Sequence, residues 1–345
     1  MGPAPAVAAV RSAVRSVLAP QRRSERRVAP QGGHANRVLV ACSGGADSLA
    51  LAAATAFEAP RAGIPAGLVT VDHGLQDGSA PQAARVAAFG YELGLDPVET
   101  IRVDVAQAGG PEGAARTARY AALAAAATAW DARVLLAHTL DDQAETVLLG
   151  LGRGSGPRSI AGMASSDGIY LRPFLGLRRA TTEAACAALD LEPWDDPHNA
   201  DPSFQRVRLR REVLPLLEDV LQGGVAEALA RTAALLADDL AALDAWAAVI
   251  NSEMWPSGQP LRAVDQREVA RLAELPRAVR TRVLRAWATQ AGAGPLSAER
   301  TAALDALVTD WHGQGPVNLP GRVCVRRESG RLVVYPASAD DVPQE

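Results

Sequence analysis

The sequence predicts an α/β fold: a parallel sheet with helices on both faces, followed by a smaller, mainly helical domain that ends in a β-hairpin. Three observations support this prediction. Apolar runs alternate with helical patterns over residues 37–220, apolar stripes at helical spacing fill 223–311, and two short apolar runs flank a glycine near the end. A chain of 345 residues is long enough for about two domains.

The first domain is expected over residues 37–220. Its strands should be continuous apolar runs, because a parallel sheet is buried on both faces. They are expected at 38–42, 66–71, 98–103 and 133–137, with a short strand around 169–174. Helical periodicity fills the intervals at 47–58, 80–94 and 113–130, and another helix begins near Asp141.

The second domain is expected over residues 221–336. Leu and Trp stripes within 229–250, 279–287 and 304–311 predict the core of a helical bundle and not a cofactor site. Four arginines within 277–285 predict a basic surface. Apolar runs at 323–327 and 332–335, turning at Gly330, predict a hairpin, and residues 337–345 are expected to form a flexible tail.

Residues 1–36 are expected to form an N-terminal helix and a linker. Valines recur at helical spacing over 7–17 among Arg11 and Arg15, and no acidic residue precedes Glu25. Such a segment is also typical of an organelle transit peptide. We favour a helix that packs on the first domain, followed by a polar linker over 20–36.

Composition excludes several classes of function. The net charge is −4, so any nucleic-acid-binding surface must be local, and no apolar stretch has the length of a membrane span. All 35 basic residues are arginine, which rules out a lysine Schiff base or a P-loop lysine. The cysteines, Cys42, Cys186 and Cys324, are far apart, which indicates a reducing compartment and argues against a zinc or iron–sulfur site.

The first motif, Ser-Gly-Gly-Ala-Asp-Ser at 43–48, directly follows the first expected strand and precedes a helix. Such a junction directs backbone N–H groups and the positive end of a helix dipole at one point, which favours a phosphate. It is not the Walker-type loop, because no lysine closes it. The alternative is an ordinary glycine-rich turn.

Two further motifs follow expected strands. Asp72 and His73 leave the second strand next to a glycine, which suits a nucleotide pocket, although such a pair is often only a turn and cap. Arg116 and Arg119 are three residues apart on an expected helix, so both project from one face. Two cations there suit a polyphosphate; the alternative is a solvated face.

The fourth motif places acidic residues after the strand at 133–137. Asp142 and Glu145 share a helix face, with Asp141 at the helix start and His138 just before it. These carboxylates would repel one another unless a cation lies among them. Acids that complement the helix dipole are the alternative, which accounts for Glu145 less well.

Together the four motifs resemble the tRNA(Ile)-lysidine synthetase family, in the short form with one C-terminal domain, within the PP-loop ATP-pyrophosphatases. The order is Ser-Gly-Gly-x-Asp-Ser, Val-Asp-His-Gly-Leu, Glu-Gly-x-x-Arg-x-x-Arg-Tyr and Ala-His-x-x-Asp-Asp-Gln-x-Glu-Thr. The resemblance covers residues 37–220 by motif, which makes that range the ATP-binding catalytic domain, with a Rossmann-like sheet, and 221–336 a tRNA-binding domain. Two departures are Asp72, where many members have Asn, and Thr139, where a second His is common.

The resemblance implies a two-step reaction in the cytoplasm. ATP adenylates the C2 oxygen of the wobble cytidine in tRNA(Ile) with a CAU anticodon, and pyrophosphate leaves. The ε-amine of free L-lysine then displaces AMP and forms lysidine. The implied cofactors are ATP and Mg²⁺, the partners are the tRNA and lysine with no membrane, and a homodimer is allowed.

The resemblance also implies residue roles. Those expected to bind ATP are Ser43, Gly44, Gly45, Ala46, Asp47, Ser48, Asp72, His73, Arg116 and Arg119. Those expected to take part in catalysis are Asp47, Arg116, His138, Asp142 and Glu145. Asp47 and Asp142 are expected to hold Mg²⁺, and Asp142 and Glu145 to bind lysine. Which group deprotonates the lysine amine stays open between a carboxylate and His138.

A basic run after the sheet is expected to bind tRNA phosphates, because family members carry a similar run; a solvated helix face is the alternative. It comprises Arg206, Arg208, Arg210 and Arg211. Two other functions are considered for the whole chain. A PP-loop tRNA thiolase would also adenylate a base but usually needs paired cysteines or a cluster, and a non-catalytic nucleotide or RNA-binding module would bind ATP without turnover.

Overall fold

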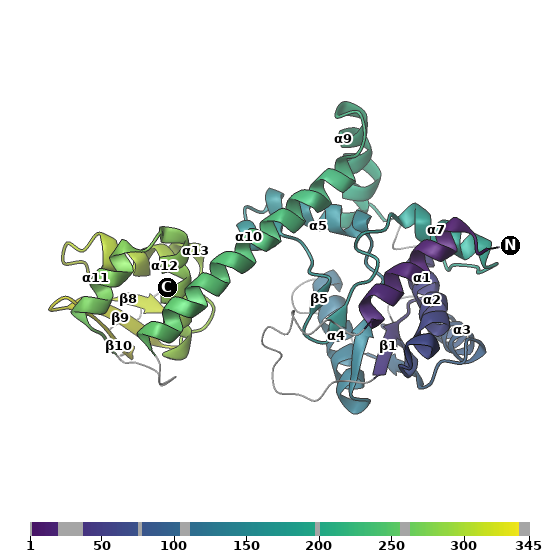
Figure 1. Cartoon of the computed structure of the whole chain (residues 1–345), viewed down its shortest axis with the longest axis horizontal. Helices are drawn as coiled ribbons and strands as arrows, with labels where there is room; N and C mark the ends of the chain where they lie inside the picture. Colours follow the sequence, from purple (N-terminus) through teal and green to yellow (C-terminus); the bar gives the residue numbers. More distant parts are fainter. Residues whose placement is uncertain are drawn as a thin grey trace. The chain divides into compact units, whose positions relative to one another are not determined.

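A computed structural model describes residues 2–19, 37–74, 78–103, 111–196, 201–255 and 263–337 (Figure 1). The chain forms two compact units, Met1–Leu236 and Ala237–Glu345. The expected linker over 20–36 and most of the expected tail lie outside the described residues. Within the described ranges, none of the helices combines the length and the apolar character needed to cross a membrane.

The first unit contains a six-stranded sheet in the order β3-β2-β1-β4-β6-β5. Its strands are β1 (Arg37–Ala41), β2 (Ala66–Asp72), β3 (Val98–Arg102), β4 (Ala132–Leu135), β5 (Ser166–Asp167) and β6 (Tyr170–Leu171). All neighbours are parallel except β5 and β6. Leu39 of β1 lies between Gly67 of β2 and Val134 of β4, at the centre of the sheet. The predicted strands and their parallel order are confirmed.

Alternate side chains of β1 pack on opposite faces of this sheet, as strand geometry requires. Val38 and Val40 belong to a core with α1, α2, α3 and α7, whereas Leu39 and Ala41 belong to a core with α4. The helices of this unit are α1 (Pro5–Leu18), α2 (Ala46–Ala62), α3 (Ser79–Glu92), α4 (Pro111–Ala129), α5 (Leu140–Gly152), α6 (Pro157–Ile160), α7 (Arg179–Ala188), α8 (Gln205–Arg208), α9 (Leu214–Val220) and the start of α10 (Val225–Met254). Helices therefore cover both faces, as predicted.

The N-terminal segment is a helix that packs on the first unit. Val7, Val10, Val14 and Leu18 form the buried stripe of α1 and join the core shared with α2 and α7. On its outer side, Arg15 donates two hydrogen bonds to the buried carboxylate of Glu58, at 2.9 and 2.7 Å. The described part of this segment is thus a helix whose apolar stripe packs on the first unit.

The boundary between the two units lies inside α10, after Leu236, whereas the sequence analysis placed it after residue 220. The first turns of α10 pack on the first unit, because Ala226 lies in a small core with Leu140 and Ala144 of α5 and Leu214 of α9. The helix therefore starts in one unit and ends in the other.

The described part of the second unit combines the end of α10 and three further helices with a four-stranded antiparallel sheet in the order β7-β10-β9-β8. The elements are α11 (Gln266–Glu274), α12 (Arg277–Gln290), α13 (Ala298–Thr309), β7 (Ala263–Val264), β8 (Val317–Leu319), β9 (Val323–Glu328) and β10 (Arg331–Pro336). The predicted hairpin of β9 and β10 is confirmed. β7 and β8, which the sequence analysis missed, extend it on both sides.

The basic surface predicted over residues 277–285 is wrong for most of its members. Arg280 is buried and pairs with Asp305 at 2.6 Å, and Arg282 pairs with Asp244 at 2.6 Å. Arg285 donates to the hydroxyl of Thr301 at 2.8 Å. One face of α12 is turned into the core, so these guanidinium groups hold the unit together.

Candidate active site

A cavity of about 330 Å³ lies at the carboxyl ends of β1 and β2, where ligands bind in open parallel sheets. The first three motifs contribute to its wall through Ser43, Gly45, Asp72, His73 and Arg119. Trp194 and Asp196, from the segment after α7, complete it. The structure therefore brings these motifs together at one edge of the sheet.

Ser48 shapes the glycine loop from inside. Its buried hydroxyl oxygen accepts hydrogen bonds from the N–H groups of Ser43 at 3.2 Å and Gly44 at 3.1 Å, and its hydroxyl lies 2.9 Å from the carbonyl of Gly45. Gly44 adopts a φ of 90°, and a Cβ there would lie 2.0 Å from the side chain of Gln82. The N–H groups of Ser43 and Gly44 are therefore hydrogen-bonded within the loop. The N–H groups at the start of α2 remain as the donors that could face a phosphate.

The start of α2 is suited to an anion. Gly45 is its N-cap and provides no side-chain cap, and Ala46 and Asp47 form its first turn. The N–H groups of a first helical turn lack intrahelical acceptors, and the helix dipole adds positive potential. The carbonyl of Gly44 accepts a hydrogen bond from the N–H of Trp194 at 2.9 Å, which ties the loop to the other wall of the cavity.

Asp72 and His73 line the cavity in different charge states. Asp72 accepts a hydrogen bond from the N–H of Gly74 at 2.9 Å, and this bond, with that of Ser79, lowers the pKa of Asp72. Burial and nearby Arg119 lower the pKa of His73, so it is neutral near pH 7. Among the described residues, its buried Nδ1 has no hydrogen-bond partner.

Arg116 and Arg119 separate in the structure. Arg119 lines the cavity, where burial lowers its pKa although a guanidinium stays charged. The Arg116 guanidinium is exposed and lies over the ring of Tyr120, 4.9 Å from its centroid. Arg119 is therefore better placed than Arg116 to reach a ligand in this cavity.

His138 is the most strongly perturbed histidine of the site. Burial, together with the charges of Arg119, Arg172 and Arg116, lowers its pKa to about 4 against the opposing effect of Asp142. Within the described part of the chain, its buried Nδ1 has no hydrogen-bond partner. At pH 7 it is thus a neutral imidazole with an unused ring nitrogen.

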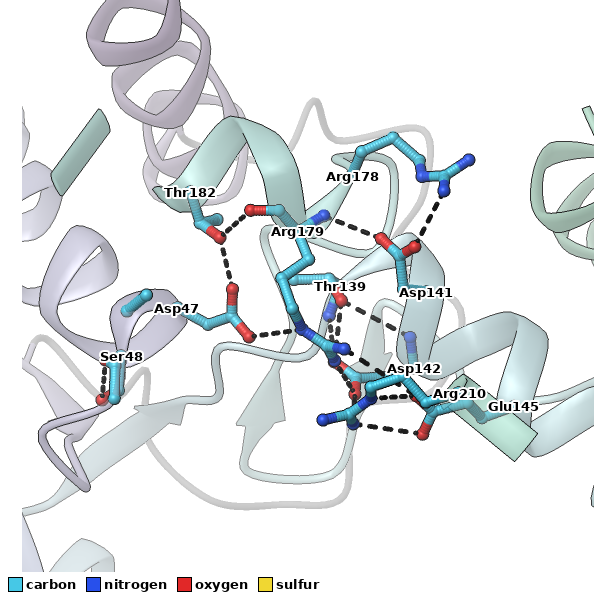
Figure 2. A network of polar contacts seen from close by, with 12 residues as sticks. Asp47, Ser48, Thr139, Asp141, Asp142, Glu145, Arg178, Arg179, Thr182 and Arg210 are labelled. Atoms are coloured by element: carbon cyan, nitrogen blue, oxygen red, sulfur yellow. Dashed lines mark hydrogen bonds and ion pairs between the residues drawn. The ribbon is translucent and has the colours of Figure 1, made fainter. Parts of the chain in front are cut away.

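The acids of the fourth motif form a network with arginines from two other segments (Figure 2). Thr139 and Asp142 make a capping box at the start of α5, and Asp142 accepts from the Thr139 N–H at 2.7 Å. Glu145 is fully buried and accepts from Arg210 Nε at 2.8 Å. Burial raises the pKa of Glu145, and the hydrogen bond from Arg210 only partly opposes this shift. Burial also acts to raise the pKa of Asp142, but Arg179 and Thr139 outweigh it, so that pKa is lowered.

Arg179, at the start of α7, is the central residue of this network and was missed by the sequence analysis. Figure 2 shows its guanidinium between Asp47, in the first turn of α2, and the acids of α5. Its Nε lies 3.3 Å from Asp47 Oδ2, and its other nitrogens lie 2.7 Å from Asp142 Oδ1 and 3.8 Å from Glu145 Oε1. Thr182, on the next turn, donates to the other oxygen of Asp47. The adjacent Arg178-Arg179 pair was the available signal.

The basic run divides into inward and outward residues. Arg210 and Arg206 point to Glu145, at 2.8 and 3.7 Å, and Arg210 lies in a π-helical turn, Leu209–Val213. Arg208 pairs with Glu212 at 2.9 Å on the surface, and Arg211 is exposed. Only two of the four arginines, Arg208 and Arg211, therefore lie on the surface that was expected to face the tRNA.

No group of three or more His, Cys, Asp or Glu side chains arranged to hold a metal occurs in the described ranges. Asp47 and Asp142, the expected metal ligands, both contact Arg179. Cys42, Cys186 and Cys324 are buried thiols, and none of them forms a disulfide in the described structure. Cys186 contacts the carbonyl of Ala46 at 3.2 Å, and burial raises its pKa to about 11, so it is an inert thiol.

Comparisons with known proteins agree with this architecture. Residues 18–217 match a family model described as a PP-loop domain, and residues 268–333 match a TilS substrate binding domain. A solved structure of the U34-tRNA thiolase NcsA from Methanococcus maripaludis has a TM-score of 0.51 and 17% identity, and covers 67% of this chain and 80% of that chain. At that identity, the similarity supports the fold alone.

Curated relatives match nearly the whole chain. The tRNA(Ile)-lysidine synthase of Thermobifida fusca (strain YX) is 56% identical over 96% of this chain and 98% of its own length. The enzyme of the same name from Streptomyces coelicolor is 55% identical, over 97% of this chain and 99% of its own. The chain belongs to the tRNA(Ile)-lysidine synthase family.

Proposed function

We propose that this protein is a ligase that converts the wobble cytidine of tRNA(Ile) with a CAU anticodon into lysidine. ATP activates the C2 oxygen of the cytidine and releases pyrophosphate, and the ε-amine of free L-lysine then displaces AMP. Membership of the family supports the activity. The observation that carries the assignment of the site is the network that joins Asp47 of the nucleotide loop to Asp142 and Glu145.

The cavity beside the glycine loop suits the nucleotide. It is walled by Thr70–His73 on one side and by the loop on the other, with Arg119 nearby. We assign the triphosphate to the start of α2, where helix N–H groups stabilise negative charge that develops as pyrophosphate leaves. Arg119 adds positive charge on the same wall.

The carboxylates of Asp47 and Asp142 would hold Mg²⁺. The set of donors fits this ion, because Mg²⁺ in nucleotide sites usually takes one or two protein carboxylates and completes its shell with phosphate oxygens and water. Each carboxylate has about four lone-pair sites. Asp47 accepts hydrogen bonds from Arg179 and Thr182, and Asp142 accepts from Arg179 and from the N–H and hydroxyl of Thr139, so both keep acceptor capacity. The ion would neutralise charge on the departing pyrophosphate.

The carboxylates of Asp142 and Glu145 suit the cationic groups of free lysine, and the chain has no lysine of its own to compete for them. The amine must lose a proton before it attacks. His138 is neutral at pH 7 and has an unused nitrogen, but a pKa of about 4 makes it a weak base. Carboxylates are also weak bases, so proton removal stays open between His138 and a carboxylate.

The cytidine must be unstacked to reach the cavity, which a single-stranded anticodon loop permits. The outward residues of the basic run, Arg208 and Arg211, are assigned to tRNA phosphates. Three cysteines that remain thiols in the described structure agree with a reducing compartment such as the cytoplasm. A homodimer is part of this proposal only as an expectation from the sequence.

The test is incubation of the protein with ATP, Mg²⁺, L-lysine and a tRNA transcript that carries a CAU anticodon. Nucleoside analysis should detect lysidine, and AMP and pyrophosphate should appear in equal amounts. A transcript with a UAU anticodon is the matched control, because uridine lacks the 4-amino group that lets the ring delocalise charge in the activated intermediate. Turnover of ATP without dependence on lysine would contradict the assignment.

A further inference from the structure

We propose that Arg179 is a positioning residue that bridges the two half-sites, by holding the loop carboxylate of Asp47 in line with the carboxylates of Asp142 and Glu145. The inference rests on the proposed function and goes beyond it, because it assigns one residue to both chemical steps. Its contacts are an Nε–Oδ2 distance of 3.3 Å to Asp47, 2.7 Å to Asp142 and 3.8 Å to Glu145.

The three carboxylates that Arg179 contacts repel one another. The carboxylates of Asp47, Asp142 and Glu145 have side-chain exposures of 24%, 15% and 0%, so water screens their repulsion poorly. All three carboxylates lie within 3.8 Å of the same guanidinium, so their charges interact. Arg210 neutralises Glu145, but Arg179 is the cation that contacts all three in the described structure.

The backbone of Arg179 is also fixed, by a neighbouring acid and a threonine. Its N–H donates to Asp141 Oδ2 at 2.7 Å, and its carbonyl oxygen lies 2.7 Å from the Thr182 hydroxyl. The Thr182 hydroxyl also contacts Asp47. The side chain is only 19% exposed. Both ends of the residue are therefore held, which gives its guanidinium a defined position.

The geometry of these three contacts requires a guanidinium. Each acid is contacted by a different nitrogen of one planar group: Nε contacts Asp47, Nη2 contacts Asp142 and Nη1 contacts Glu145. A lysine ammonium is a compact point charge and cannot span acids on opposite sides. Replacement by lysine should therefore preserve charge but lose the alignment.

The experiment measures the two steps separately in Arg179→Ala and Arg179→Lys. Pyrophosphate release with tRNA and without lysine reports adenylation, and lysine added after adenylated tRNA has accumulated reports transfer. In Arg179→Ala, adenylation should fall at least about tenfold, and the lysine concentration for half-maximal transfer should rise at least about tenfold. Arg179→Lys should keep the wild-type melting temperature and recover only part of either loss.

Arg178→Ala is the matched control, because Arg178 precedes Arg179 and also bridges two carboxylates, Asp141 and Glu227, at 3.0 and 2.7 Å. It should change neither step by more than about threefold. The bridge is overturned if Arg179→Ala affects only one step, or if Arg179→Lys restores both fully. An inactive wild type would overturn the proposed function as well, whereas an active wild type with unaffected variants overturns the bridge alone.

Discussion

Replacement of Glu145 by Gln should weaken lysine binding while adenylation of the tRNA persists. The Glu145 carboxylate is fully buried and lies among three guanidinium groups, those of Arg210, Arg206 and Arg179, at 2.8, 3.7 and 3.8 Å. The amide keeps the shape but loses the charge that a lysine ammonium needs. A charge-assisted hydrogen bond in a desolvated site contributes about 1.5–3 kcal/mol, so the half-saturating lysine concentration should rise about ten- to hundredfold.

The assay follows pyrophosphate release and lysine incorporation separately over a range of lysine concentrations. Glu227→Gln is the matched control, since Glu227 also accepts from an arginine, Arg178, at 2.7 Å but lies outside the network of Figure 2. It should leave the lysine dependence unchanged. If Glu145→Gln abolishes pyrophosphate release before lysine is added, and excess Mg²⁺ restores it, the residue serves the metal and the lysine assignment is wrong.

Three further predictions concern the loop, the basic run and the N-terminal helix. Ser48→Ala removes the oxygen that organises the loop amides, so pyrophosphate release should fall about a hundredfold with an unchanged circular dichroism spectrum; wild-type turnover would contradict this. Arg211→Ala should reduce the salt slope of tRNA binding by about one on a log–log plot, whereas Arg210→Ala should leave that slope unchanged and impair lysine transfer; equal slopes for both would refute the division of the run. Arg15 lowers the pKa of Glu58, so the ion pair stabilises the fold above the ordinary glutamate pKa of about 4.3 and is lost as pH falls below it. The urea midpoint of Glu58→Gln should therefore lie below that of the wild type at pH 7 and approach it near pH 3, and a constant difference would contradict the linkage.

The fold could be predicted largely from the sequence because its strands are continuous apolar runs. Residues 38–42 are wholly apolar and 66–71 are interrupted only by Thr70, and the structure has strands at Arg37–Ala41 and Ala66–Asp72. The same signal fails for β7 (Ala263–Val264) and β8 (Val317–Leu319), because two or three residues cannot display a period. Their pairing with the hairpin is a tertiary effect.

The candidate site could be predicted only in part, because sequence spacing reports neighbours on one element. Asp142 and Glu145 share a face of α5, and the expectation that a cation must lie among the acids follows from their charge. The structure places guanidinium groups there, those of Arg179 and Arg210. Arg179 is separated from Asp47 by 132 positions, so no local pattern connects them.

The basic run shows why a count of charges in sequence overestimates a nucleic-acid surface. Arg206 and Arg210 are four residues apart and both reach Glu145, while Arg208 lies on another side of the segment and pairs with Glu212. Cations that neutralise a buried carboxylate release no counterions from DNA or RNA, so they add nothing to the salt dependence of binding. They instead set the charge that an incoming lysine meets at Glu145. The same four arginines therefore serve two purposes, and the side of the helical segment on which each one lies decides which.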